Sequence, residues 1–432
     1  ALLLVLDNCE HLTTAAASLA DAVLAEAPGV MLLATSQRPL KLPAEQLLRL
    51  APLPVPPAGD PSADSPALQL LLARARALDA GFTLADGDRP LALDLCRRLD
   101  GLPLAIELAA VRIPALGLRG VLSRLHDRLH LLTRPAAPLR HASLADALAW
   151  SVSLLEPPLQ ALFNTLGVFN GSFGIEMALT VGAASGLDEW AVLDGLGRLV
   201  DHSLLVPVQT GDAPRLRLLE SARAFALQRL QAAGEGPRLR RRHAEAVCQL
   251  LAHNGVAREE GRLSGGAALL AVRAELDNVR AAMDWVLAAP DPGADPARDN
   301  PASRAPIGQS IVADAWPAMM FIGLHHEATR WMLALQPHLS DATPARTAGF
   351  MLLGLGKVCL STPALPPRER HEVLLRAQAL LDTLPRTEYA MAVRQTLAQS
   401  ACQLGDAGAA LAATDQALAL LDHGDQANYR AD

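Results

Sequence analysis

The chain has 432 residues, of which 51% are hydrophobic and 3% aromatic, and its formal net charge is −7. This length predicts roughly two to four domains, and the acidic balance argues against a protein that binds polyanions over its whole surface. The five cysteines have no metal-ligand spacing and no apolar run is long enough to cross a bilayer. We therefore expect reduced thiols, no membrane partner and a cytoplasmic location.

The N-terminal stretch has the pattern of a βαβ unit. Residues 1–6 (ALLLVL) form an unbroken apolar run that ends at Asp7, and residues 30–34 (VMLLA) form a second run that ends at Thr35. Each run predicts a parallel strand buried on both faces, and residues 10–27 between them have helical spacing. The polar residues then meet at the carboxyl ends of the strands, where open α/β sheets bind ligands.

An aspartate at that edge holds Mg²⁺ beside phosphates in nucleotide-binding sheets. The plainer alternative is that Asp7 only caps the following helix. Asn8 stands where hydrolytic ATPases carry a catalytic carboxylate, and an amide cannot act as a general base, so we expect slow hydrolysis at most and no catalytic residue here. The 432 residues contain no glycine-rich phosphate loop with its lysine, and we expect that loop upstream of residue 1.

The rest of the chain divides at proline-rich stretches and at changes of pattern. Six prolines in residues 51–66 predict a linker without packed structure, and five in residues 290–306 predict a flexible insert. Residues 47–50 are the candidate for one further short strand. The predicted segments are an α/β nucleotide-binding part (1–50), a linker (51–66), a helical lid (67–140), a winged helix (141–235), a helical connector (236–289), a flexible insert (290–306) and helical repeats (307–432).

Three helices followed by a β-hairpin and a closing helix is the order of a winged helix. The expected helices are 146–169, 175–181, 188–202 and 220–232, and the expected strands are 204–208 and 215–219. The helix at 188–202 has four acidic residues and a single arginine, Arg198, and would repel DNA phosphates. We therefore expect an internal, regulatory winged helix, with DNA contacted only through an upstream domain.

The C-terminal helices are expected to come in pairs. Two segments share a glycine in a turn, followed by small or apolar residues at +5 and +12. This is the spacing of tetratricopeptide-like pairs, which stack into a solenoid with a concave binding surface. The residues concerned are Gly323, Ala328 and Leu335 in one segment, and Gly405, Ala410 and Ala417 in the other.

Five motifs in order resemble one family. LLLVLDNCEHL, LLATSQRPL, LDGLPLAIELAA, LVDHSLL and RLRLLESARAFAL follow one another between residue 2 and residue 227. Together they resemble the NB-ARC/STAND class of signal-transduction ATPases, in the form found in bacterial transcriptional regulators of the LuxR and winged-helix types. The fold class this implies is mostly α, with a partial α/β P-loop NTPase sheet, a helical lid, a winged helix and a C-terminal tetratricopeptide-like α-solenoid.

The resemblance also implies roles for individual residues. Asp7 would be the acid that holds Mg²⁺, directly or through water, with Asn8 beside it. Thr35 and Ser36 would end the strand that carries the γ-phosphate sensor. The sensor position itself departs from the family pattern, because Gln37 stands where an arginine is usual and Arg38 follows it. Pro103 of the GLPL motif would lie on the adenine side of the nucleotide, and Gly101 of the same motif would also belong to the nucleotide site. The family's Met-His-Asp triplet corresponds to Leu218, Leu219 and Glu220, so its histidine is absent.

The function that follows is a regulator switched by ADP and ATP with Mg²⁺. Its repeats would sense a protein or a small molecule, and the active form would self-associate. Two alternatives remain open: a hydrolytic ATPase that remodels a partner, and a nucleotide-free scaffold whose degenerate sheet only supports the repeats.

Overall fold

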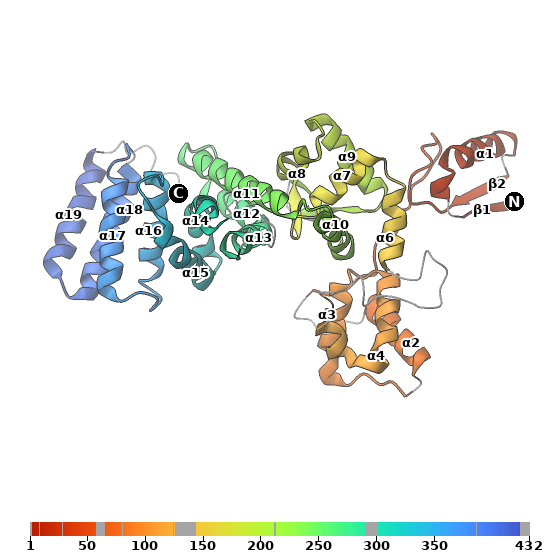
Figure 1. Cartoon of the computed structure of the whole chain (residues 1–432), viewed down its shortest axis with the longest axis horizontal. Coiled ribbons are helices and arrows are strands. Elements are labelled where there is room, and N and C mark those ends of the chain that lie inside the picture. Colours follow the sequence, from red (N-terminus) through yellow and green to blue (C-terminus); the bar gives the residue numbers. More distant parts are fainter. Residues whose placement is uncertain are drawn as a thin grey trace. The chain divides into compact units, whose positions relative to one another are not determined.

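A computed structural model describes residues 2–7, 9–27, 29–57, 65–79, 81–123, 125, 144–210, 213–289, 300–385 and 387–423 (Figure 1). The chain divides into two compact units. The first comprises Ala1–Val168 with Gly174–Gly236, and the second comprises Phe169–Phe173 with Pro237–Asp432. The described residues are mostly helical, and none of their helices is long and apolar enough to cross a bilayer.

The N-terminal segment is a βαβ unit, as predicted. Strand β1 (Leu2–Leu6) leads through a short 3-10 helix, η1 (Cys9–His11), into α1 (Thr13–Glu26), and the chain returns in β2 (Val30–Ala34). The two strands pair in parallel and in register, from Leu2 opposite Val30 to Leu6 opposite Ala34. The register brings the carboxyl ends of both strands to the same edge.

The predicted burial of these strands is not found among the described residues. Leu2 is 62% and Met31 is 71% exposed, because only two strands pair and α1 does not cover both faces. The prediction of a strand at 47–50 is also wrong: the segment is irregular, and Leu48 is 86% exposed. The linker, by contrast, packs more than predicted, since Leu53 donates its N–H to the Gly101 carbonyl oxygen (2.9 Å).

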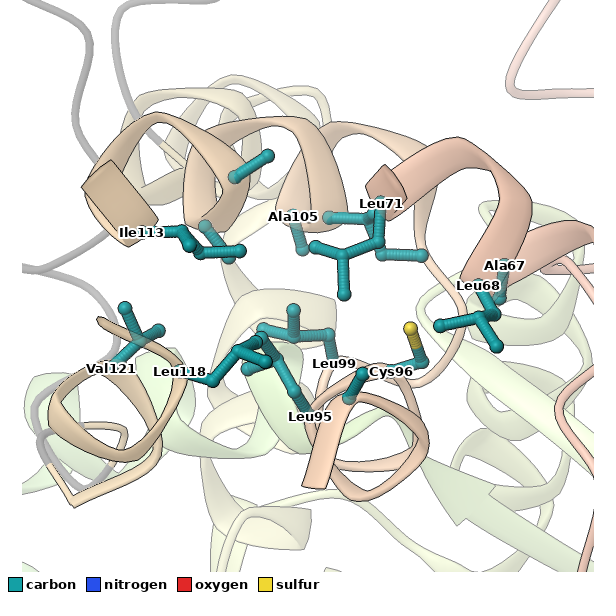
Figure 2. Close-up of a cluster of buried hydrophobic side chains, with 14 of the residues drawn as sticks. Ala67, Leu68, Leu71, Leu95, Cys96, Leu99, Ala105, Ile113, Leu118 and Val121 are labelled. Atoms are coloured by element: carbon teal, nitrogen blue, oxygen red, sulfur yellow. The ribbon is translucent and has the colours of Figure 1, made fainter. Parts of the chain in front are cut away.

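A small helical cluster follows, formed by α2 (Pro66–Leu78), η2 (Asp86–Asp88), α3 (Arg89–Arg98) and α4 (Pro103–Ser123). Figure 2 shows side chains of α2, α3 and α4 converging on one apolar centre. Helix α4 bends at Gly117, whose φ is 66°. Residues 126–143, which include the end of the predicted lid, lie outside the described residues.

The predicted winged helix is present, with one correction. The helix expected at 146–169 is two helices, because Pro157 and Pro158 cannot continue the first and instead occupy the opening turn of the second. Strands β4 and β5 pair antiparallel as the predicted hairpin. The elements are α6 (Leu144–Ser153), α7 (Pro157–Leu166), β3 (Ser172–Gly174), α8 (Ile175–Gly182), η5 (Ala183–Ser185), α9 (Glu189–Asp201), β4 (Leu205–Thr210), β5 (Ala213–Leu218) and α10 (Glu220–Ala232).

The second unit is a succession of helices packed against their neighbours. From α13 onward each helix contacts the next or the next but one, and Figure 1 shows α16 to α19 side by side. The turns at Gly323 (φ 80°) and Gly405 (φ 77°) separate helices where the repeat pattern places them. The helices are α11 (Gly236–Glu259), α12 (Gly265–Ala274), α13 (Leu276–Leu287), α14 (Pro301–Phe321), α15 (His325–Leu335), η6 (Gln336–His338), α16 (Ala345–Val358), α17 (Pro367–Leu381), α18 (Thr387–Leu404) and α19 (Ala407–His423).

The flexible insert predicted at 290–306 is wrong for its last seven residues. Asn300 caps α14 in a capping box with Ser303, whose N–H donates to Asn300 Oδ1 (2.9 Å), and Pro301 takes the first helical position, which tolerates proline. Arg304 is fully buried and donates to the carbonyl oxygen of Trp285 (2.6 Å). Residues 290–299 lie outside the described residues.

Candidate functional site

Two of the predicted site residues meet at the carboxyl edge of the strands. The Thr35 hydroxyl donates a hydrogen bond to Asp7 Oδ1. The backbone fixes this arrangement, because Thr35 donates its N–H to the Leu6 carbonyl (2.9 Å) and Cys9 donates its N–H to the Thr35 carbonyl (2.9 Å). Both side chains remain exposed, so their oxygens are accessible from solvent. Asn8 lies outside the described residues.

Ser36 and Arg38 continue the site along the loop after β2. The Ser36 hydroxyl accepts the Arg38 N–H (3.2 Å), which turns the chain, and the Arg38 guanidinium donates to the Glu10 carbonyl and to the Thr13 hydroxyl (3.5 Å). These contacts hold Arg38 against the start of α1. The loop continues with both oxygens of Glu45 accepting backbone N–H groups, from Leu40 at 2.9 Å and from Lys41 at 2.7 Å.

A pocket of about 490 Å³ lies between α1, the loop after β2 and the C-terminal end of α9. Its cationic lining residues are Arg38, Lys41 and Arg198, and its acidic ones are Asp21 and Asp201, which leaves one positive charge in excess. A small concave space with surplus positive charge suits an anionic group. The other lining residues are Thr13, Thr14, Ala17, Ser18, Pro39, Leu40, Leu42 and His202.

His202 is the most perturbed group in this pocket. Burial, followed by the nearby positive charges of Arg38 and Arg198, lowers the pKa of His202 from its ordinary 6.5 to about 4. The imidazole is therefore neutral at pH 7, and its Nδ1 is buried without a hydrogen-bond partner among the described residues. The LVDHSLL motif contained this residue, but the sequence alone gave no reason to separate it from a buried core histidine.

One surface ion pair joins the N-terminal segment to the winged helix. Arg49 donates to the Asp201 carboxylate (2.9 Å) and to the Val200 carbonyl (3.2 Å). Arg198, one turn earlier on α9, pairs with Glu156 (3.1 Å). The end of α9 that lines the pocket is thus held by charged groups on either side.

Gly101 and Pro103 are not among the residues that line this pocket. Gly101 has a φ of 65°, and a Cβ atom there would lie 2.1 Å from the Leu53 carbonyl oxygen, so this position requires glycine for structural reasons. Pro103 is exposed as the first residue of α4, where proline is favoured. The assignment of both residues to the nucleotide site stays a prediction.

Asp100, which directly precedes the GLPL motif, makes a contact that the sequence did not predict. The Asp100 carboxylate is 4% exposed and accepts the Glu220 N–H at 2.7 Å, with Arg217 at 3.4 Å. An anionic group at this end of α10 is favourable, because the first N–H groups of a helix lack partners within it. The helical cluster is thereby attached to the winged helix at the start of α10.

The structure offers no preformed cage for a metal among the residues it describes. No group of three or more His, Cys, Asp or Glu side chains gathers there in a geometry that could hold an ion. Asp7 and Thr35 together present a carboxylate and a hydroxyl, the oxygen ligands that Mg²⁺ accepts when water and phosphate complete its shell. Asp7 as a Mg²⁺ ligand is compatible with this geometry and stays a prediction.

Residues 155–231 match the family model described as a winged helix-turn-helix domain. The match covers α7 to α10, which form the helices and the hairpin of this domain in the structure. This part of the chain is a winged helix-turn-helix domain.

The chain is also similar to proteins of mycobacteria. It is 35% identical over 288 residues to a Mycobacterium bovis protein named "Putative HTH-type transcriptional regulator", covering 66% of this chain and 31% of the relative. It is 36% identical over 236 residues to an uncharacterized protein of Mycobacterium tuberculosis, covering 54% of this chain and 58% of the relative. The chain therefore spans only part of the length of these relatives.

Among solved structures, the chain is similar to a STAND protein with a tetratricopeptide repeat sensor from Pyrococcus horikoshii. The identity is 12%, the coverage is 98% of this chain and 62% of the other, and the TM-score is 0.28.

Proposed function

We propose that this chain belongs to a cytoplasmic transcriptional regulator that is switched by ADP and ATP. The observation that carries the proposal is the hydrogen bond between Thr35 and Asp7 at the edge of a parallel strand pair. The adjoining loop places Arg38 in a pocket with surplus positive charge, which the end of α9 in the winged helix also lines. The names of the mycobacterial relatives support the regulatory role.

Different residues of the site would contact different parts of the nucleotide. Mg²⁺ would neutralise the phosphates, with Asp7 as its protein ligand and with Thr35 and Ser36 as hydroxyl donors to the same region. Arg38 would contribute a positive charge toward the terminal phosphate. Asn8, Gly101 and Pro103 complete the proposed nucleotide contacts, and a phosphate loop elsewhere in the longer protein would supply most of the others.

The switch would act through the contacts that hold the winged helix. Arg49 joins the N-terminal segment to Asp201, and Asp100 joins the helical cluster to the start of α10. ADP would stabilise this joined arrangement and ATP an open one that self-associates, because a ligand shifts an equilibrium only through its different affinities for two states. A protein or small-molecule signal at the helical repeats would bias the same equilibrium.

The test is the rate of ADP release from the longer protein that contains this chain. In the Arg49→Glu variant the new carboxylate faces Asp201, and we expect a fluorescent ADP analogue to leave about fivefold faster. The matched control is Arg74→Glu, which reverses a similarly exposed ion pair, with Glu107, inside the helical cluster. Equal release rates in both variants and the parent protein would contradict the proposed switch.

A nucleotide-free scaffold is the second candidate. It is favoured by the exposed faces of β1 and β2 and by the engagement of Asp7 with a protein hydroxyl. A scaffold retains no ADP whether or not Asp7 is replaced by alanine, whereas the switch loses its ADP only in the variant. Hydrolysis that exceeds a slow background and disappears with Asp7→Ala would instead support an ATPase that remodels a partner.

A further inference from the structure

The second unit contains a pocket that the nucleotide switch does not use. It measures about 480 Å³ and lies between α11, α12, α14 and α16. All of its lining residues belong to the second unit, which makes it independent of the nucleotide site in the first. A volume of this size matches sites for drug-sized ligands.

Most of the pocket wall is apolar. Leu251 and Leu269 line it together with Val272, Pro317 and the aromatic ring of Phe350. Phe321 belongs to the same wall and is 84% exposed, an unusual position for a large aromatic side chain in a folded protein. An apolar molecule in the pocket would remove this surface from water.

The acidic and the basic side chains of the pocket differ in whether they already have a partner. Asp314 is 2% exposed and pairs with Arg346 at 2.9 Å, so its negative charge is already balanced. Arg346 also lies over the Phe350 ring, 5.1 Å from its centroid, which holds the guanidinium in place. Arg258 lines the same pocket, is exposed, and makes no ion pair among the described residues.

The start of α12 adds to this positive character. Gly265 and Gly266 are its first two residues and both line the pocket. The N-terminal end of a helix carries a partial positive charge, and a negative ligand group near it is stabilised. A Cβ atom built on either glycine meets nothing within 4 Å, so open space lies above this turn.

We infer that this pocket binds a small amphipathic anion, an apolar and preferably aromatic molecule with one carboxylate or sulfonate group. The apolar body lies against Leu269, Pro317 and Phe321, and the anionic group pairs with Arg258 at the mouth. A cationic ligand is disfavoured, because Asp314 is the one acidic residue among the described residues that line the pocket, and it is already paired with Arg346. As the site where a signal enters the regulator, this inference rests on the proposed function.

The test uses two fluorescent probes of similar shape with the 432-residue chain. Anilinonaphthalene sulfonate carries an anionic group, and phenylnaphthylamine is its neutral counterpart. The Arg258→Gln variant should bind the sulfonate about five- to tenfold more weakly and the neutral probe about as well as the parent chain. Arg262→Gln, which removes a nearby arginine that does not line the pocket, is the matched control and should change neither affinity.

A second variant tests whether the probes bind in this pocket. Gly266→Leu fills the open space above α12 and should weaken both probes at least about tenfold. Its control is Gly197→Leu, a helical glycine in the first unit that also has open space around it. Unchanged binding in Gly266→Leu would overturn the pocket, and an equal effect of Arg258→Gln on both probes would overturn the anionic class. Retention of ADP is measured separately, so failure of the nucleotide switch leaves these outcomes intact.

Discussion

Gly101 of the GLPL motif is required by the fold itself. Its positive φ and the 2.1 Å separation between a built Cβ atom and the Leu53 carbonyl oxygen predict that Gly101→Ala lowers the free energy of unfolding by about 2–5 kcal/mol. Gly186→Ala is the control, because this glycine also has a positive φ but open space, and it should cost only about 1 kcal/mol. Urea unfolding followed by circular dichroism measures both, and equal costs would contradict the proposed close contact.

His202 predicts a specific pH dependence of stability. Its pKa is about 4 in the folded chain and ordinarily 6.5, so between these values the unfolded chain takes up a proton that the folded chain excludes. Its contribution is fully present above pH 6.5 and is lost as the pH falls toward 4. Unfolding free energies measured across this range should decline more steeply for the parent chain than for His202→Asn, and parallel curves would show that His202 is not buried in the neutral form.

The site illustrates what single residues reveal in a sequence. Asp7 and Thr35 could be paired from the sequence, because each directly follows an apolar run and parallel strands end at one edge. The roles of His202 and Asp100 could not be predicted from the sequence. They depend on interactions with residues more than 100 positions away, such as Arg38 and Glu220. Periodicity describes local structure and carries no information about such contacts.

At the scale of elements, the glycines of α16 allow this helix to pack closely against its neighbours. A Cβ atom on Gly356 would lie 2.3 Å from Leu374 Cδ2, so Gly356→Ala should lower the free energy of unfolding by about 1–3 kcal/mol by forcing α17 away. Gly197 on α9 has no atom within 4 Å of its built Cβ, and Gly197→Ala should raise stability by about 0.5–1 kcal/mol through helix propensity. Thermal unfolding of both variants checks the opposite signs, and stabilisation by Gly356→Ala would refute the close packing of α16 on α17.

The exposed surface of α9 predicts weak DNA binding by this winged helix. Glu189, Trp190 and Asp194 are exposed on it. The chain should therefore bind duplex DNA no more tightly than about 10⁻⁴–10⁻⁶ M at physiological salt, the range of non-specific contacts. Replacing Glu189 and Asp194 by lysine should strengthen binding measured by fluorescence anisotropy.

Lysines at Glu369 and Asp415 serve as the control for that double variant. They change the net charge equally, but on exposed positions of α17 and α19. Nanomolar binding by the unmodified chain would contradict a purely regulatory winged helix.

The elements also show where patterns predict well and where they fail. Strand β2 and helix α10 have the predicted boundaries, because an apolar run or helical spacing ends there. Two of the errors concern proline. Pro157 starts a helix where a single helix was expected to continue, and Pro301 starts a helix where a flexible insert was expected. Proline excludes the interior of a helix but favours its first turn, and composition alone does not distinguish the two.

At the scale of the whole molecule, the two units have separate tasks in this account. The first contains the proposed nucleotide site and the winged helix, and the second contains the helical stack with its apolar pocket. The proposed switch requires that further elements cover the exposed faces of β1 and β2, since parallel sheets are normally covered on both faces. Tight binding of nucleotide is accordingly expected of the longer protein and not of these 432 residues alone.

The most direct test of the nucleotide switch is the content of the longer protein purified without added nucleotide. Denaturation followed by chromatography should release ADP in near-stoichiometric amount from the parent protein and little from Asp7→Ala. A parent protein that is empty and also fails to bind added ADP or ATP would contradict the switch and leave the helical repeats as the place to look for function.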